Sequence, residues 1–383
     1  MRQSFYILLV LSLFVSCGQK SSEEAYFLTK LGNDTLAVER FLIEDQSIVA
    51  DVILRSPKTS LRRYEMTWNE DESLNEMTVT DFTPSNSFNS EGSVVQKITT
   101  NGDSLNVVYY NPNGDRMLST RNRDNLIPFV DMVHWPYELA FNRAVKLESD
   151  SIDQYMITGR RNSNFIIHRL DDTSYTLRHP SRGVMDVTTS SQGKLMSLDA
   201  GQTTRKLKVE RAFELPFDQL ATSFAENDRI NSPFGTLSPP ITNAYHFSNT
   251  DFEVSHGSPA KRGREIFGGI VPYNQRWRTG ANRATHFKTS KNLMIQGQQV
   301  PAGEYTLFTI PEPAGGILII NRQTGQNGRS YDESRDLMRV QMNRTDFNPL
   351  VESFTISVTE TDQGGRLNLM WDRTVYFIDF EIL

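Results

Sequence analysis

The stretch with the greatest potential for ligand chemistry runs from Ser255 to Lys291 and is strongly basic. It holds one acidic residue, Glu265, and eight basic residues: Lys261, Arg262, Arg264, Arg276, Arg278, Arg283, Lys288 and Lys291. Eight minus one gives a local charge of +7 in a chain whose formal net charge is -6. Guanidinium groups bind carboxylate or phosphate through paired hydrogen bonds, and nearby glycines let backbone N–H groups approach an anion. The pattern therefore suits anion recognition.

Two interpretations of this stretch stay open. In the first, it binds an anionic small molecule or an acidic glycan, and the ligand-binding candidates are Arg264, Arg278, Gly280, Asn282, Arg283 and His286. In the second, the arginines pair with acids elsewhere in the chain and Trp277 anchors a core. If Arg276, Trp277 and Arg278 formed a strand, alternation would place both arginines on the face opposite the tryptophan.

Catalytic and metal-binding signatures are missing from the sequence. It has no G-x-S-x-G, H-E-x-x-H, P-loop or G-x-G-x-x-G motif. The six histidines are His134, His168, His179, His246, His256 and His286, and no two stand at metal-ligand spacing. We therefore expect no catalytic set, no metal and no cofactor. Proton transfer by His256 or His286, which flank the basic stretch, stays open as an alternative.

The single cysteine of the chain, Cys17, follows a short positive start, an apolar run from Phe5 to Val15 and the small residue Ser16. The run is shorter than the ~20 residues of a membrane-spanning helix. This pattern predicts a lipoprotein signal peptide over residues 1–17, with lipid attached to Cys17, and a polar tether over residues 18–25. The alternative is a plain signal peptide with a chance cysteine. We expect an outer-membrane lipoprotein of the cell envelope, on its periplasmic or its surface face.

Composition bounds the rest of the chain. Charged residues make up 22% and the mean hydropathy is -0.46, which is typical of a soluble globular protein. A pI of about 5.6 argues against a nucleic-acid partner, which would need a basic surface. A length of 383 residues allows two or three domains.

Residues 26–231 show short β-rich runs separated by turns such as Asn101-Gly102 and Asn113-Gly114. Asn and Gly tolerate the positive φ that hairpin turns require. Residues 128–144 break this pattern with helical spacing, and Pro136 in their middle predicts a kink or two short helices. We expect an all-β domain, an antiparallel meander or open half-barrel, with a short helical segment.

Three prolines with Gly and Ser predict a linker over residues 232–243. Beyond it, Ile317 to Ile320 form a continuous apolar run, and Phe354, Ile356 and Val358 alternate with polar residues. Residues 244–383 are therefore predicted to form a C-terminal β-sandwich domain.

Four segments carry a resemblance to a known family. They are GREIFGGIVPY (residues 263–273), WRTGAN (277–282), PAGEYTLFTIP (301–311) and YDESRD (331–336). Together they resemble the domain-of-unknown-function 2911 family of Bacteroidota envelope proteins, over about the last third of the chain, from Phe252 onward. The chain departs from the family at Asn327-Gly328, where a Trp-Gly step is frequent, and at His286, where a small residue is usual. The resemblance implies an envelope location and no particular activity.

These observations favour a membrane-anchored lipoprotein with a non-catalytic binding or accessory role. A hydrolase acting on an envelope or nutrient polymer is the first alternative, and a cleft joining His256 or His286 to a carboxylate would support it. A lipid or lipoprotein carrier is the second, and a deep apolar cavity in the N-terminal half-barrel would support it. A shallow, Arg-lined face with neither feature would support binding, and the most informative observation is which side chains from Arg262 to Arg283 converge on a common pocket.

Overall fold

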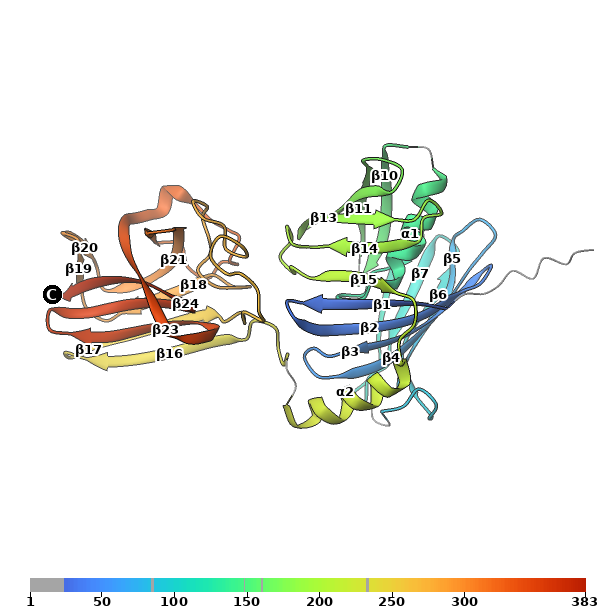
Figure 1. Ribbon diagram of the computed structural model, residues 1–383, viewed down its shortest axis with the longest axis horizontal. Coiled ribbons are helices and arrows are strands. Elements are labelled where there is room, and N and C mark those ends of the chain that lie inside the picture. Colours follow the sequence, from blue (N-terminus) through green and yellow to red (C-terminus); the bar gives the residue numbers. More distant parts are fainter. Residues whose placement is uncertain (1–23, 84–85, 148, 160, 232–233) are drawn as a thin grey trace, which may run out of the picture.

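The computed structural model describes residues 24–83, 86–147, 149–159, 161–231 and 234–383. This part of the chain is mostly β-strand and forms two large sheets with two short α-helices (Figure 1). The expected all-β class with a short helical segment is thus confirmed. Cys17 and the rest of the predicted signal peptide lie outside the described residues. No helix of the described part is long and apolar enough to cross a membrane.

The N-terminal sheet has fifteen strands and curves strongly. Its strands are β1 (Glu24–Leu31), β2 (Asp34–Ile43), β3 (Ser47–Leu54), β4 (Ser60–Trp68), β5 (Leu74–Asp81), β6 (Ser93–Asn101), β7 (Ser104–Tyr109), β8 (Arg116–Arg121), β9 (Ile127–Pro128), β10 (Ser151–Thr158), β11 (Arg161–Arg169), β12 (Ser174–His179), β13 (Gly183–Thr189), β14 (Leu195–Asp199) and β15 (Lys208–Ala212). Neighbours in sequence pair antiparallel, except that β9 pairs parallel with β10 and that β8 and β9 form the two edges of the sheet and do not pair. Strand β15 returns to pair with β1. Curvature brings Thr120 on β8 within 3.2 Å of Asn162 on β11, between Oγ1 and Oδ1, yet these strands do not pair, so the barrel stays open.

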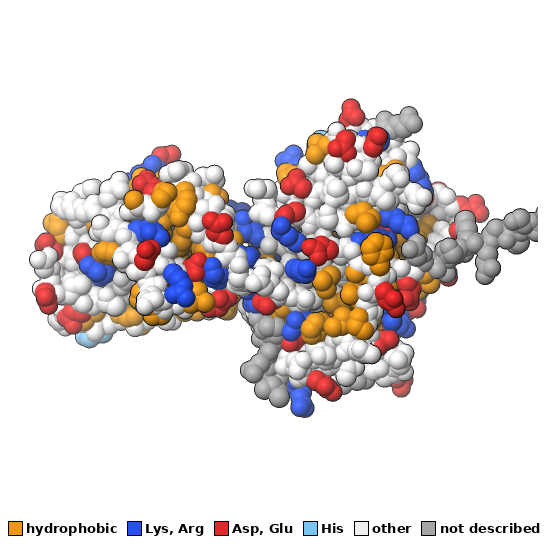
Figure 2. All heavy atoms as spheres, in the orientation of Figure 1, with side chains coloured by type: hydrophobic (Ala, Val, Ile, Leu, Met, Phe, Trp, Pro, Cys, Tyr) orange, Lys and Arg blue, Asp and Glu red, His pale blue; other side chains and the backbone are white. Residues whose placement is uncertain are grey.

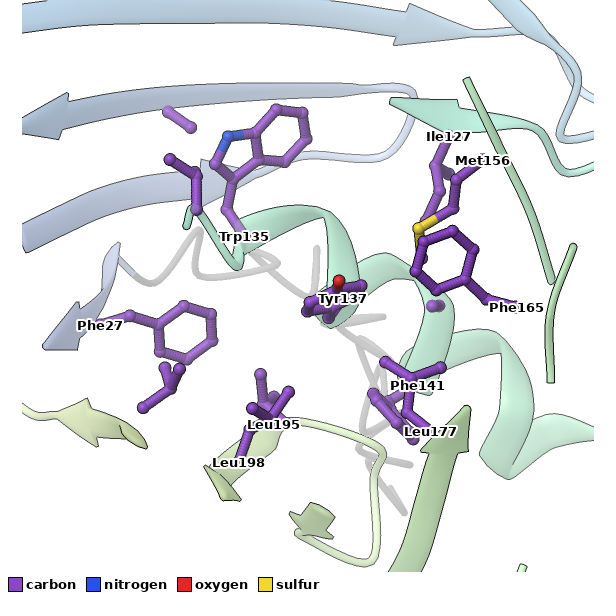
Figure 3. Close-up of a cluster of buried hydrophobic side chains, with 14 of the residues drawn as sticks. Phe27, Ile127, Trp135, Tyr137, Phe141, Met156, Phe165, Leu177, Leu195 and Leu198 are labelled. Carbon is purple, nitrogen blue, oxygen red and sulfur yellow. The ribbon is translucent and has the colours of Figure 1, made fainter. Parts of the chain in front are cut away.

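Helix α1 (Trp135–Lys146) fills the concave side of this sheet (Figure 3). It buries Trp135, Tyr137 and Phe141 against strand residues such as Phe27 and Phe165. The predicted kink at Pro136 was wrong, because the helix begins one residue earlier and the proline sits in the first turn. There a missing N–H costs nothing, since the first N–H groups of a helix have no intrahelical partner.

Helix α2 (Phe217–Asn231) covers part of the opposite side of the N-terminal sheet, below β1 to β4 in Figure 1. Phe217 and Ala221 pack with Val38, Ile53 and Leu61 in a second, smaller core. Buried residues of alternating strands therefore face two different cores. The sheet is covered by a helix on each side, which gives it two packed faces.

The C-terminal sheet has nine strands and folds over itself. They are β16 (Pro240–Phe247), β17 (Thr250–Gly257), β18 (Thr285–Thr289), β19 (Leu293–Ile295), β20 (Gln298–Val300), β21 (Gly303–Glu312), β22 (Gly315–Asn321), β23 (Asp336–Thr361) and β24 (Gly364–Ile382), with a 3-10 turn at Glu333–Arg335. The long strands β23 and β24 change register between Asp346 and Thr355. Tyr245 on β16 consequently donates to the carbonyl oxygen of Ile356 on β23 (3.2 Å), and a sandwich-like core lies between the layers.

The connection between the sheets is short. Strand β16 already begins at Pro240, inside the predicted linker, because the first position of an edge strand tolerates a residue without N–H. The sheets touch where the backbone N–H of Asn33 donates to Arg262 O (3.0 Å) and Arg262 Nη1 pairs with Asp34 Oδ2 (2.9 Å). The division into two independently folding domains stays a prediction.

Candidate functional site

A pocket of about 990 Å³ lies at the junction of the two sheets. Its walls come from the N-terminal sheet, the connector and the C-terminal sheet, and Figure 2 shows Lys and Arg side chains on both sides of this junction. The lining residues are Leu31, Arg182, Thr204, Arg205, Lys206, Phe234, Gly235, Thr236, Leu237, Ser238, Pro239, Ser258, Pro259, Ala260, Arg262, Arg264, Ile270, Trp277, Arg278, Gly280, Ala281, Asn282, Asn327, Arg329, Glu352, Ser353 and Trp371.

The lining is strongly cationic. It includes seven basic side chains (Arg182, Arg205, Lys206, Arg262, Arg264, Arg278 and Arg329) and one acidic side chain, Glu352. Arg262 and Asp34 form an ion pair. Arg182 and Arg205 both pair with Asp131, the former at 2.5 Å between Nη1 and Oδ1. Burial opposes ionisation of Asp131, but these two arginines outweigh it and hold the pKa of the carboxyl below its ordinary value.

Four of the cations have no carboxylate partner within the described residues: Lys206, Arg264, Arg278 and Arg329. Lys206 Nζ donates to Gly201 O (3.0 Å), and Arg264 donates to the carbonyl oxygens of Lys261 (2.9 Å) and Ala260 (2.6 Å). Arg329 reaches across the junction to Ser181 O and to the hydroxyl of Thr204. Neutral acceptors thus hold three of these side chains in place without an ion pair, and Arg264 feels only the more distant charges of Glu352 and Asp34.

The pKa values of these groups reflect that imbalance. Burial lowers the pKa of Arg264 to about 10, and the positive charge of Arg262 acts in the same direction. Burial and then Arg329 lower the pKa of Arg278. Burial, followed by the charges of Arg264 and Arg278, lowers the pKa of Lys206. Because the cations repel one another at a partly desolvated site, an anion placed among them would gain from all of them at once.

The loop from β17 to β18 positions the C-terminal arginines. Trp277 forms an isolated bridge with Thr309 (N–O distances 2.7 and 2.9 Å), and its ring packs on Phe354 and stacks on Trp371 at 6.1 Å between centroids. The prediction that Arg276 and Arg278 share a face opposite Trp277 was wrong. The bridge spans a single residue and the chain turns at Thr279 (φ 53°), so strand alternation does not extend that far.

Arg276 and Arg278 therefore have different surroundings. Arg276 is exposed and lies over the ring of Tyr331, 4.1 Å from its centroid. Arg278 is half-buried and lines the pocket together with Trp277. The two residues form a natural pair for experiments, since one motif supplies both an arginine in the pocket and an arginine outside it.

Of the six predicted ligand-binding residues, the structure brings four to this pocket: Arg264, Arg278, Gly280 and Asn282. Gly280 has φ +147°, and a Cβ there would meet Gly257 O at 3.0 Å, so the close backbone of β17 already requires glycine. Asn282 Nδ2 donates to Ser238 O (3.2 Å) and ties the loop to the connector.

The other two predicted residues, Arg283 and His286, are not among the pocket residues. Arg283 is exposed, and its backbone bridges to Asn327. His286 lies on β18, where its Nε2 accepts the backbone N–H of Gly325 (3.0 Å). His256 is buried, with Nε2 3.3 Å from Phe354 O, and burial lowers its pKa. Neither histidine has a carboxylate partner within the described residues, which also contain no cluster of three potential metal ligands.

Sequence reasoning missed four pocket cations from the N-terminal sheet and from the loop between β22 and β23, namely Arg182, Arg205, Lys206 and Arg329. The first three follow strands β12 and β14 in turns, where the sequence shows only short basic steps beside Gly183 and Gly201. Nothing in their spacing relates them to the basic stretch from Lys261 to Arg283, which lies far away in sequence. A weak signal was available in Arg205-Lys206, a basic pair in a turn-forming segment.

Fold and pocket together define an all-β protein with two sheets and a cationic pocket at their junction. Residues 238–380 match the family model of DUF2911, a protein of unknown function. No curated protein matches the chain. Among solved structures, the chain is similar to a DUF1089 family protein from Pseudomonas aeruginosa, with 14% identity and a TM-score of 0.31 over 43% of this chain and 90% of that chain. At this level of similarity, no inference about this chain follows from it.

Proposed function

We propose that this protein binds a multiply charged anion in the pocket between its sheets and does so without catalysis. The observation that carries the proposal is the set of four pocket cations without a carboxylate partner in the described residues. A partly buried charge that is left unpaired destabilises the folded protein. A bound anion would supply the missing counter-charge, and guanidinium groups are well suited to hold carboxylate or phosphate groups.

The alternatives find less support. The pocket residues include one carboxylate, Glu352, and no histidine, so the paired acid and base that a hydrolase needs have no candidates among them. The carrier hypothesis called for a deep apolar cavity in the N-terminal half-barrel. The concave side of that sheet is instead occupied by α1 and its rings Trp135, Tyr137 and Phe141.

The proposal includes the location and anchor that the sequence predicts. A lipid on Cys17 would hold the binding pocket at the outer membrane. Replacing Cys17 with alanine should then abolish incorporation of radiolabelled palmitate and release the protein from the membrane fraction. Equal palmitate labelling of the wild type and the variant would contradict the anchor without touching the pocket.

The decisive test compares two arginines of one motif. Binding of inorganic pyrophosphate, tripolyphosphate and acidic oligosaccharides is measured by calorimetry on the full chain and on the Arg278→Ala and Arg276→Ala variants. Losing Arg278 should weaken binding of the best anion by ~1.5–3 kcal/mol, the range of a hydrogen bond to a charged group, which is about 10- to 100-fold in Kd. Arg276→Ala should bind like the wild type. Equal effects of the two substitutions, or no binding of any anion by the wild type, would refute the proposal.

A further inference from the structure

We infer that the ligand of this pocket is an acidic oligosaccharide long enough to touch both sheets. The inference rests on the proposed anion binding and narrows it to one class of ligand. Its starting point is the distribution of charge between the walls. Lys206 belongs to the N-terminal sheet, whereas Arg264, Arg278 and Arg329 belong to the C-terminal sheet. A ligand with more than one anionic group can therefore pair with cations of both walls.

The pocket lining also includes polar side chains that can accept hydrogen bonds from a ligand. Glu352 Oε1 accepts the backbone N–H of Arg262 (2.7 Å), which fixes a carboxylate in a wall of the pocket. Asn282, Asn327 and Ser353 line the same pocket. A carboxylate repels phosphate oxygens but accepts hydrogen bonds from hydroxyl groups. The site thus favours a ligand whose anionic groups alternate with hydroxyls over one that is anionic throughout, such as an inorganic polyphosphate.

The size of the pocket and its tryptophan also favour an oligosaccharide as the ligand. A volume of about 990 Å³ is at the upper end of the ~300–1,000 Å³ typical of small-molecule sites, so a single phosphate or monosaccharide would leave most of it to water. Trp277 contributes a half-buried indole to the wall. An indole offers an apolar surface next to polar groups, which fits the mixed C–H and hydroxyl faces of a sugar ring.

The inference is tested by calorimetry on the full chain with matched probes. The acidic probes are trigalacturonate, an alginate tetrasaccharide and a chondroitin sulfate tetrasaccharide. The comparison probes are galacturonate, maltotriose, tripolyphosphate and ATP. At least one acidic oligosaccharide should bind about tenfold or more tightly than galacturonate, tripolyphosphate and ATP, because its anionic groups pair with cations of both walls while its hydroxyls donate to Glu352, and maltotriose should not bind.

Two variants separate the contributions. Lys206→Ala, on the N-terminal wall, should weaken binding of the preferred oligosaccharide about tenfold, as Arg278→Ala does on the other wall. Glu352→Gln keeps a carbonyl acceptor for the N–H of Arg262 but removes the negative charge. It should tighten tripolyphosphate binding several-fold and should not tighten oligosaccharide binding, because the ligand hydroxyls lose a charged acceptor. If tripolyphosphate or ATP binds the wild type more tightly than every acidic oligosaccharide, the inference is overturned while anion binding stands. If no charged probe binds, both fail.

Discussion

Buried charges inside the N-terminal sheet and charges in the pocket between the sheets are treated differently. Glu138 on α1 is 2% exposed, and its two oxygens accept from both Nη atoms of Arg211 at 3.1 Å and from the backbone N–H of Leu195 at 2.7 Å. Glu39, fully buried, accepts the backbone N–H groups of His134 and Trp135 at the start of α1. In the pocket, Arg278 and Arg264 form no ion pair with a carboxylate of the described residues, although Glu352 and Asp34 lie near enough to Arg264 to attract its charge.

The contrast separates structural charges from those kept for a ligand. A buried charge destabilises a protein core unless other groups of the protein compensate it. The pairs around α1 satisfy that requirement and hold the helix against the sheet. The pocket does not satisfy it, although neutral acceptors keep several of its arginines ordered. Such a site is complete only when something outside the chain supplies the counter-charge.

The largest loss of stability is expected when one of the compensated ion pairs in the core is broken. Glu138→Ala leaves Arg211, whose side chain is 12% exposed, without its counter-charge. We expect a loss of about 3–5 kcal/mol in the free energy of unfolding, the range for breaking one partner of a buried ion pair. Urea denaturation measures it. The exposed pair Lys97–Glu76 serves as control, because Glu76→Ala should cost less than about 1 kcal/mol. Similar losses in both variants would show that burial of the pair does not matter.

The second prediction concerns the stability of the folded protein at acidic pH. Burial, assisted by the charge of Arg182, lowers the pKa of His179 to about 4. In an unfolded chain histidine titrates near ~6.5, so between these pH values the folded protein binds fewer protons than the unfolded one, and its stability falls as the pH falls. We expect His179 to account for a loss of about 2 kcal/mol between pH 6.5 and 4. His179→Asn should show a flatter dependence of unfolding free energy on pH. An unchanged slope would mean that the imidazole titrates normally.

The third prediction addresses the junction itself. Asp34→Asn removes the ion pair with Arg262, one of the contacts that hold the sheets together. Arg262 is 9% exposed but Asp34 is 39% exposed, so the pair is worth more than a surface pair and less than a buried one, about 1–2 kcal/mol. Its loss should speed proteolytic cleavage of the connector, between Ser232 and Pro240, by about five- to thirtyfold.

The same digest tests the predicted domain boundary. If the two sheets are independent domains, the fragment from Pro240 onward should keep its near-UV circular dichroism after cleavage. A fragment that loses this signal would show that the two sheets depend on each other for folding.

The sequence predicted local features of the fold well because they depend on neighbouring residues. Turns such as Asn101-Gly102 lie between β6 and β7, and the apolar run at Ile317 to Ile320 lies in buried β22. Pro136 misled the prediction of α1, because a proline in a first helical turn and one in a helix interior look alike until the start of the helix is known. The point at which the C-terminal sheet folds over itself depends on irregular pairing of β23 and β24, which alternation does not encode.

The candidate site was predictable only in the part that is local in sequence. The density of arginines and glycines from Lys261 to Arg283 identified Arg264, Arg278, Gly280 and Asn282 as neighbours. Arg182 and Lys206 reach the same pocket through contacts between sheets, which leave no trace in spacing. Charge density also predicted a residue that does not line the pocket, because Arg283 belongs to the same run but is exposed to solvent. Whether an arginine enters a pocket depended on single turns such as the one at Thr279.

The smallest change in stability is expected when a pocket arginine that has no ion-pair partner is replaced. Arg278→Met keeps an unbranched apolar stem against the pocket wall and removes the guanidinium. Because no carboxylate within the described residues is left unpaired by this change, and because repulsion from Arg329 disappears, the free energy of unfolding should stay within about 0.5 kcal/mol of the wild type. Arg211→Met is the matched control: it strands Glu138 in the core and should destabilise by about 3–5 kcal/mol. Urea denaturation of both variants without added anion gives the result. A loss in Arg278→Met comparable to that in Arg211→Met would make Arg278 a structural residue, and the contrast between core and pocket would no longer hold.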